Sequence, residues 1–271
     1  MNKKIRRVAL AVLLLAVFTV GGVLAYFTDG DTKTNEFTVG KISIDLIEPA
    51  WDASKALEIT PKAELSKDPH VKNDGQNDAF VFLTVEAPVE NLITAADNGT
   101  RQAAADIELF SYGYGSTAGV RDDWVLIGTY LKDASTHEYG QMIARDGTVD
   151  LTGKEAIKRV YAYASTSGSA VNPTVLAADA FTPALFDYVK VANIVEDQID
   201  LAQRDIVVNA YGIQTQNVLE DSTIYDGSNA DGSADAVAIW GVIVNANPTL
   251  NDKGADAEHS GYTAPTATVI A

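Results

Sequence analysis

The three histidines are the first residues that could do chemistry. A zinc protease places two histidines four positions apart on a helix, with a glutamate base beside the first. His137 and Glu138 begin such a pattern, but Gln141 stands where the second histidine belongs. The flanking residues are typical of turns, and His70 and His259 lie far away in the sequence. We therefore expect no catalytic residues and no zinc site, and we interpret the three histidines as surface residues.

The acidic stretch 226–235 is a second candidate site, because its spaced oxygen donors and glycines are compatible with a calcium loop. Asp226, Asp231 and Asp235 would supply the carboxylate ligands. The stretch lacks the alternating ligand order and the terminal glutamate of a helix-loop-helix calcium site. A solvated hairpin loop is the favoured interpretation. Calcium is kept as the alternative, and no other cofactor is expected.

Two further patterns could bind ligands. Residues 113–118 fit a loose glycine fingerprint for nucleotides, but no helix start follows them, so we expect a loop there. Two aromatic pairs, Tyr161 with Tyr163 and Trp124 with Trp240, could line a carbohydrate surface. Such residues pack in a core or on a sheet face more often. Serine-histidine catalysis is disfavoured, because no serine stands in a strand–elbow–helix setting.

The composition excludes several classes of protein. The chain has 271 residues, of which 46% are hydrophobic, and this is enough for a packed core. There is no cysteine, which excludes disulfides, thiolate metal sites and cysteine nucleophiles. A net charge of −17 is repelled by nucleic acid and by anionic lipid, so no nucleic-acid partner is expected. Self-association should respond to salt, acid or divalent cations, which relieve the repulsion between copies.

Residues 1–25 have the pattern of an export signal. A basic start precedes the apolar run 8–20, and small residues, Val23 and Ala25, lie at the end. We expect cleavage between Ala25 and Tyr26. Removing the four cations of this segment takes the net charge from −17 to −21. The apolar run is long enough for an uncleaved membrane anchor to be the alternative.

The rest of the chain has the alternation of a β protein. Ile42, Ile44 and Leu46 alternate with polar residues, which predicts a strand over 37–46 whose apolar row faces the core, with a bulge at Gly40. Further strands are predicted at 79–85 (buried on both faces and ended by Pro88), 124–131, 160–164, 206–213 and 236–244. The last also fits a helix. Short helices are predicted at 101–110 and at 186–202, where an edge strand is the alternative. This organisation predicts an all-β fold with a few short helices, an antiparallel sandwich.

Several blocks of the sequence resemble the TasA/camelysin family. They are Tyr26-Phe27-Thr28-Asp29, Phe37-Thr38-Val39-Gly40, Glu48-Pro49-Ala50-Trp51, and the stretches 67–73, 182–189 and 206–214. The resemblance implies a secreted bacterial protein, matured by a dedicated signal peptidase and folded as a jelly-roll-like sandwich. Because camelysin is described as a metalloprotease, it also implies an alternative function as a cell-surface metalloprotease.

These observations predict four segments: a signal peptide at 1–25, a flexible arm at 26–36, a β-sandwich domain at 37–245 and a loose tail at 246–271. We expect an exported structural subunit that polymerises into extracellular biofilm-matrix or cell-surface fibres. A carbohydrate- or adhesin-type binding module is the other alternative.

Strand addition is the mechanism that the resemblance implies for such a fibre. The arm residues Tyr26, Phe27, Thr28 and Asp29 would pair with an open sheet edge of the next subunit. The expected partners are therefore copies of the same chain, the signal peptidase during export, and other matrix or cell-surface proteins.

Overall fold

The structure is a computed structural model that describes residues 42–52, 60–168, 170–195, 197–199, 204–215 and 235–246. All of them belong to the unit of the chain that begins at Gly40. The predicted signal peptide, the predicted arm, the bulge at Gly40 and the tail beyond Ala246 therefore lie outside the described residues. No helix within the described ranges is long and apolar enough to cross a membrane.

The described residues form strands β1 to β13 and one helix, α2. The strands are β1 (Ile44–Ile47), β2 (Glu64–Ser66), β3 (His70–Asn73), β4 (Ala79–Leu92), β5 (Ala105–Glu108), β6 (Phe110–Tyr114), β7 (Thr117–Ala118), β8 (Trp124–Asp133), β9 (Ile143–Ala144), β10 (Lys154–Ser167), β11 (Ala170–Pro173), β12 (Tyr188–Val191) and β13 (Val207–Gln214). Helix α2 spans Asp235–Ala246.

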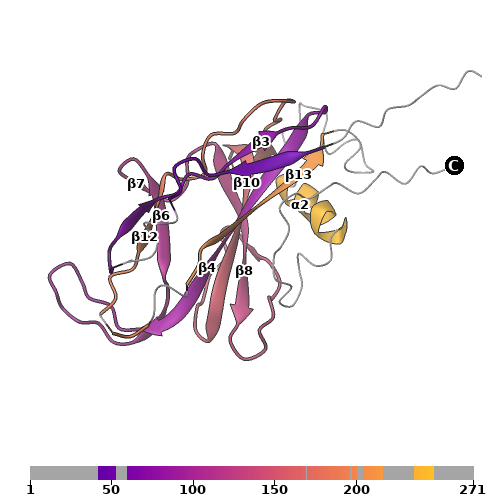
Figure 1. The fold of residues 1–271 in the computed structure, drawn as a ribbon. Helices are drawn as coiled ribbons and strands as arrows, with labels where there is room; N and C mark the ends of the chain where they lie inside the picture. The colour runs from indigo at the N-terminus through magenta and orange to yellow at the C-terminus, as the bar shows by residue number, and fades with distance from the viewer. Residues whose placement is uncertain are drawn as a thin grey trace, which may run out of the picture. The chain divides into compact units, whose positions relative to one another are not determined.

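The strands form three antiparallel sheets (Figure 1). The largest sheet has the order β13-β4-β10-β8-β9, with β5 paired to the end of β4 and β11 paired to the end of β10. A second sheet has the order β2-β12-β6-β7, and β1 pairs with β3 alone. The two smaller sheets share one apolar cluster with the largest sheet, so they form the opposite layer of a sandwich. This confirms the predicted fold class, an all-β antiparallel sandwich.

Strand β4 is buried on both faces, as its continuous apolar sequence predicts. Val81, Leu83 and Val85 point into the cluster between the two layers. Phe80 and Phe82 point to the other face, into a second cluster that α2 covers. The prediction that Pro88 ends this strand is wrong. β4 continues to Leu92, because Pro88 still pairs with β10 and the residues from Val89 to Leu92 pair with β5.

The prediction of a helix over 101–110 is also wrong. Its alanine-rich start favours a helix, but the backbone of Ala105–Glu108 pairs with β4 as strand β5. Leu109 and Phe110 are almost fully buried, so long-range packing decides the local structure.

The segment 236–244 is a helix and not the closing strand that its β-branched residues favour. Ala236, Ile239, Trp240, Ile243 and Val244 are all buried, and this spacing matches one face of a helix. The segment 186–202 contains β12, which lies between β2 and β6 and is therefore neither a helix nor an edge strand.

Candidate assembly interface

The candidate site begins where the predicted arm meets the sandwich. Ala25, Tyr26, Phe27, Thr28 and Asp29 lie outside the described residues, so the predicted cleavage site and arm remain predictions. The described chain starts at Ile42, two residues before β1. Strand β1 is therefore the first described element after the predicted arm.

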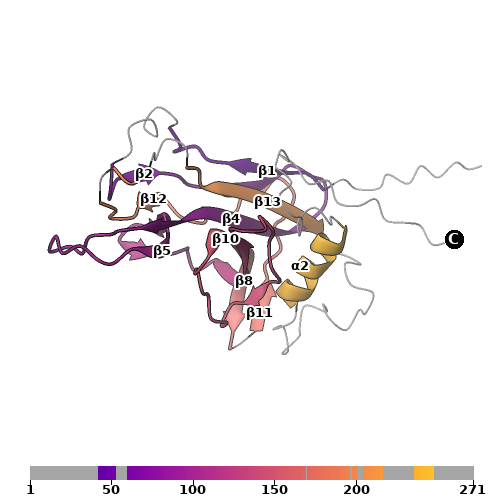
Figure 2. The ribbon, with the colours of Figure 1, turned by 90° about the horizontal axis from the view of Figure 1, so that it is seen from below.

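Strand β1 and strand β13 each use one edge in a ladder. β1 pairs with β3 from Ile44 opposite Asn73 to Ile47 opposite His70. β13 pairs with β4 along its whole length. Within the described ranges no strand pairs with the second edge of either. Figure 2 shows β1 beside β13, so two edge strands from opposite layers lie next to each other.

Gly212 allows β1 and β13 to lie close together. A Cβ atom placed on Gly212 would lie 2.9 Å from Cγ2 of Ile44, closer than side chains pack. The absence of a side chain at this position therefore lets β1 lie against β13. A glycine inside a strand pattern signals such a close approach. Gly212 within the predicted strand 206–213 is the feature of the sequence that indicates this contact.

Apolar side chains line both strands at this junction, which we call the β1–β13 seam (44–47 and 206–212). Leu46, Ile206, Val208 and Ala210 are only partly buried against the core between the layers. Val207 is 37% exposed. Unpaired backbone edges next to partly exposed apolar side chains are a template for an added strand. The seam therefore combines the two features that strand addition needs.

A partly buried ion pair holds the residue that follows β1, Glu48, in place. Lys67 Nζ lies 2.7 Å from Glu48 Oε2, and these side chains are only 8% and 20% exposed. The ring of Trp51 covers the same ammonium, with 4.7 Å between Nζ and the ring centroid. The backbone N–H of Ala50 donates to Asp68 Oδ1 at 2.8 Å. Two of the sequence blocks that carry the family resemblance, 48–51 and 67–73, thus hold each other in place.

The block 182–189 joins the same region. The backbone N–H of Lys67 donates to the carbonyl of Asp187, and the N–H of Val71 donates to Oγ1 of Thr182. The Asp187 carboxylate accepts two hydrogen bonds from Nη2 of Arg121, at 2.7 and 2.9 Å. Blocks that are far apart in the sequence therefore meet around β3 and position β1 as one edge of the seam.

A polar cluster joins β10 to β5 and β6. Arg159 makes a two-point ion pair with Glu108, at 2.5 and 2.7 Å. The hydroxyls of Tyr112 and Tyr161 are hydrogen-bonded to each other. Burial raises the pKa of both tyrosines. Burial alone would lower the pKa of Arg159, but the hydrogen bonds to Glu108 and the electrostatic interactions with Tyr112, Glu108 and Tyr161 together raise it. Near neutral pH both tyrosines therefore stay protonated and Arg159 stays charged, so we interpret this cluster as structural.

The histidine candidates do not gather into a metal site within the described residues. His137 follows the turn after β8 with a positive φ of 58°, so the prediction that it lies outside a helix is confirmed. Its Nδ1 lies 2.6 Å from Glu155 Oε2. His70 lies on β3, and His259 is outside the described residues. No group of three or more histidine, aspartate or glutamate side chains that could hold a metal is found in the described part of the chain.

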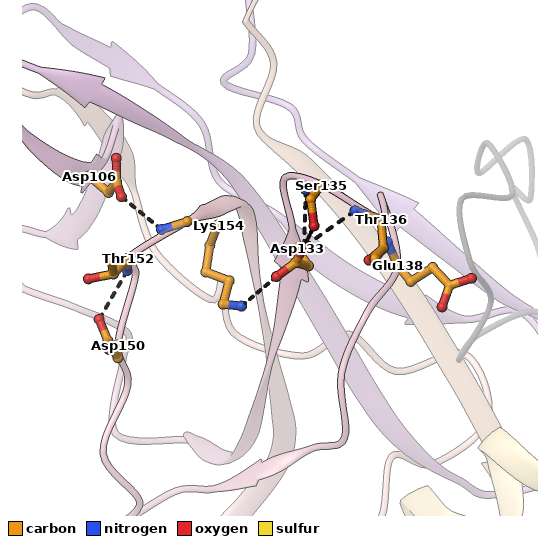
Figure 3. A network of polar contacts seen from close by, with 9 residues as sticks. Asp106, Asp133, Ser135, Thr136, Glu138, Asp150, Thr152 and Lys154 are labelled. Carbon is orange, nitrogen blue, oxygen red and sulfur yellow. Dashed lines mark hydrogen bonds and ion pairs between the residues drawn. The ribbon is translucent and has the colours of Figure 1, made fainter.

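The turn that carries His137 is held by Asp133, whose contacts Figure 3 shows. Asp133 Oδ1 accepts hydrogen bonds from the Ser135 side chain and from the backbone N–H groups of Ser135 and Thr136. Lys154 Nζ lies 2.9 Å from the other oxygen of the same carboxylate. These contacts hold the pKa of Asp133 well below its usual range, through Ser135 first and Lys154 second.

The calcium and carbohydrate candidates have different outcomes. Asp226 and Asp231 lie outside the described residues, and Asp235 is the first residue of α2, so the calcium site remains a prediction. The two tryptophans pack in the core, which was the favoured interpretation of the aromatic pairs. Trp124 and Trp240 are each 3% exposed, and they lie in different apolar clusters on opposite faces of the largest sheet.

The comparisons with known proteins agree with the sequence blocks of the first half of the chain. The model of the family described as camelysin metallo-endopeptidase matches residues 1–108. No curated protein and no solved structure matches the chain. The matched stretch contains the blocks at 26–29, 37–40, 48–51 and 67–73, whereas those after residue 108 lie outside it. Over residues 1–108, the resemblance of this chain to the TasA/camelysin family is confirmed.

Proposed function

We propose that this chain is an exported structural subunit that polymerises into extracellular biofilm-matrix or cell-surface fibres. The observation that carries the proposal is the β1–β13 seam, where two neighbouring edge strands carry partly exposed apolar side chains. After cleavage behind Ala25, the arm 26–36 of one copy adds as a strand at the seam of the next copy. Such a contact joins different surfaces of the two copies and does not close on itself, so it builds a filament.

The arm gains more from a neighbouring copy than from its own subunit. Tyr26 and Phe27 are its only large apolar residues, apart from them it is mostly polar, and it begins at a new chain end. Burying Phe27 against the apolar side chains of the seam contributes about 1.5–3 kcal/mol. Each main-chain hydrogen bond to an open edge adds about 0.5–1.5 kcal/mol. Several such bonds together give an affinity that suits stepwise growth of a fibre.

Deletion of the arm tests this function. Protein that starts at Tyr26 should form fibres visible by negative-stain electron microscopy, whereas protein that starts at Phe37 should stay monomeric with the same melting temperature. The Phe27→Asp variant should slow growth, because the arm then loses its apolar anchor. Fibres of normal appearance from the protein that starts at Phe37 would exclude this role for the arm.

A metallo-endopeptidase is the second candidate function, because the matching family model carries that description. His137 and Glu155 are in contact, but the described residues bring no third ligand to them. We expect purified protein not to cleave casein. Cleavage that a chelator stops and that His137→Ala abolishes would establish a peptidase instead.

Retention on a glycan array would favour the carbohydrate-binding alternative.

A further inference from the structure

A cavity of 270 Å³ lies where β4 begins and β13 ends, at one end of the largest sheet. Its lining comes from the turn between β3 and β4, with Gln76, Asn77 and Asp78, and from the end of β13, with Gln214 and the next residue, Thr215. All five side chains are polar, whereas most ligand pockets are lined predominantly by hydrophobic and aromatic side chains. The cavity therefore suits a ligand that is held by hydrogen bonds.

The backbone around this cavity is held by Asn73, whose side chain is completely buried. Its Nδ2 donates to the carbonyl of Asn77 at 2.9 Å, and its Oδ1 accepts a hydrogen bond from the backbone N–H of Gly75. The two walls are joined by the backbone N–H of Thr215, which donates to the carbonyl of Asp78. Walls that are fixed in this way present their side chains in a defined arrangement, which lowers the cost of ordering them around a ligand.

The side chains that line the cavity are not used to hold the fold together. Within the described ranges, no hydrogen bond or ion pair joins any of the five side chains to another residue. The three amides each offer one acceptor and two donors, Thr215 offers a hydroxyl, and the Asp78 carboxylate only accepts. A ligand that replaces water here must therefore offer both donors and acceptors, closely spaced.

We infer that this cavity binds a neutral sugar residue, either free or as part of a polysaccharide. Each sugar hydroxyl both donates and accepts, which matches the mixture of amides, hydroxyl and carboxylate in the lining. Two neighbouring sugar hydroxyls can donate to the Asp78 carboxylate, and hydrogen bonds to a charged acceptor are stronger than those between neutral groups. The same carboxylate and the net charge of −17 repel acidic sugars, so the ligand is a neutral one.

The volume and the charge of the cavity favour a sugar over a metal ion. At about 30 Å³ for each water molecule, the cavity has the volume of about nine waters, which is far more than one ion fills. Calcium sites usually gather several carboxylates, and this lining has one, Asp78. None of the described lining residues is aromatic, so the affinity comes from hydrogen bonds alone, and we expect a dissociation constant of about 1 mM. Sugar binding goes beyond the proposed function and does not depend on polymerisation.

Thermal unfolding of soluble protein tests the inference, with glucose, galactose, mannose and N-acetylglucosamine as probes. At about 10 mM, at least one of these sugars should raise the melting temperature by about 3–6 °C. Asp78→Asn should lose this rise but melt like the wild type without sugar, because the Asp78 side chain contributes no contact to the described fold. Asp146→Asn is the matched control, since it removes the same charge from the exposed turn after β9 and should keep the rise. No rise with any of these sugars, or equal rises in the two variants, would overturn the inference.

Side-chain amide signals in NMR spectra locate the bound sugar. The sugar that raises the melting temperature should shift the amide signals of Gln76, Asn77 and Gln214, whereas those of Gln102, an exposed glutamine outside the cavity, should stay in place. Calcium chloride is the competing probe, and shifts of the cavity signals by calcium but by none of the sugars would overturn the inference in favour of a cation site. Both measurements use soluble protein, so a chain that makes no fibres would contradict the proposed function while sugar binding is still decided here.

Discussion

Gly212 of β13 lies against Ile44 of β1 so closely that no side chain fits between them. A Cβ atom on Gly212 would lie 2.9 Å from Cγ2 of Ile44, and Cγ2 is held by a β-branched side chain that is only 8% exposed. This contact joins the first described strand to the edge of the largest sheet. Strain introduced here acts on the seam and on the core between the two layers.

The Gly212→Val variant should therefore lose about 1–3 kcal/mol of unfolding free energy, the usual cost of overpacking. Urea unfolding followed by circular dichroism measures the loss. The double variant Gly212→Val/Ile44→Ala should lose less unfolding free energy than the two single variants lose in sum, because the smaller side chain at position 44 makes room for the valine. The expected coupling energy is about 0.5–3 kcal/mol. Simple additivity of the two changes would show that the contact does not limit the approach of the strands.

The buried pair of Lys67 and Glu48 should matter more for stability than the exposed pairs. Glu48→Gln leaves the Lys67 ammonium buried without its counter-charge, which should cost about 3 kcal/mol. Lys190 with Glu64 is the control, because both side chains are more than 40% exposed. Glu64→Gln should change the unfolding free energy by no more than about 1 kcal/mol. Equal effects of the two variants in urea unfolding would contradict the importance of the buried pair.

Acid should weaken the turns around Asp133, Asp106 and Asp150. Hydrogen bonds lower the pKa of each carboxyl, from Ser135 first for Asp133, Asn91 first for Asp106 and the Thr152 backbone first for Asp150. A lowered pKa in the folded state gives stability that is present above the unfolded value of about 4 and is lost as the pH falls through the folded value.

The Asp133→Asn variant tests this dependence. Its melting temperature should be lower than that of the wild type at pH 7, and the difference should shrink as the pH falls below about 4. Asp122→Asn, an exposed aspartate outside these turns, is the control and should melt like the wild type at both pH values. A difference for Asp133→Asn that stays constant between pH 7 and pH 3 would mean that this carboxylate is not the group that titrates.

Fibre growth should also depend on ionic strength. A processed copy has a net charge of −21, and neighbouring copies repel within a Debye length of about 10 Å at 0.1 M salt. Turbidity should therefore rise faster at about 500 mM salt than at about 10 mM, where screening is weak. A growth rate that is independent of salt over this range would show that charge repulsion does not limit assembly.

The sequence predicts the central strands well and the periphery less well. Residues 79–85, 124–131, 160–164 and, of the predicted strand 206–213, residues 207–213 lie in strands, because their apolar runs or alternation reflect burial that the sheet imposes. The segment 236–244 was predicted as a strand, with a helix as the alternative, because Val and Ile favour strands. Its helical structure depends on the packing of Trp240 against Phe82 and Tyr130, which the sequence alone does not show.

For the candidate site too, the sequence predicts local structure but not long-range contacts. That a strand follows the predicted arm could be predicted from the alternation of Ile42, Ile44 and Leu46, and the burial of Ile42 and Ile44 confirms the core assignment. The neighbour of that strand could not be predicted, because the contact of Ile44 with Gly212 joins residues 168 positions apart. The surroundings of Lys67 could not be predicted either, because a lysine in the sequence does not reveal that Glu48 and Trp51 enclose it.

The edge of β13 offers the most direct test of strand addition. Val207 is 37% exposed at the start of this strand, so Val207→Lys should change the unfolding free energy by no more than about 0.5 kcal/mol. A lysine at a strand edge opposes the addition of another strand, because its ammonium would lose water in the new contact. Fibre growth from Val207→Lys should therefore be slower than from the wild type.

The added positive charge by itself acts in the opposite direction, since it reduces the repulsion between negatively charged copies. Val149→Lys carries the same charge in the loop after β9, at the far end of the strand order from β13, and should grow at least as fast as the wild type. Slow growth of the Val207 variant together with normal growth of the Val149 variant would locate the growing contact at the seam. Equal growth of both variants would place that contact on another edge of the subunit.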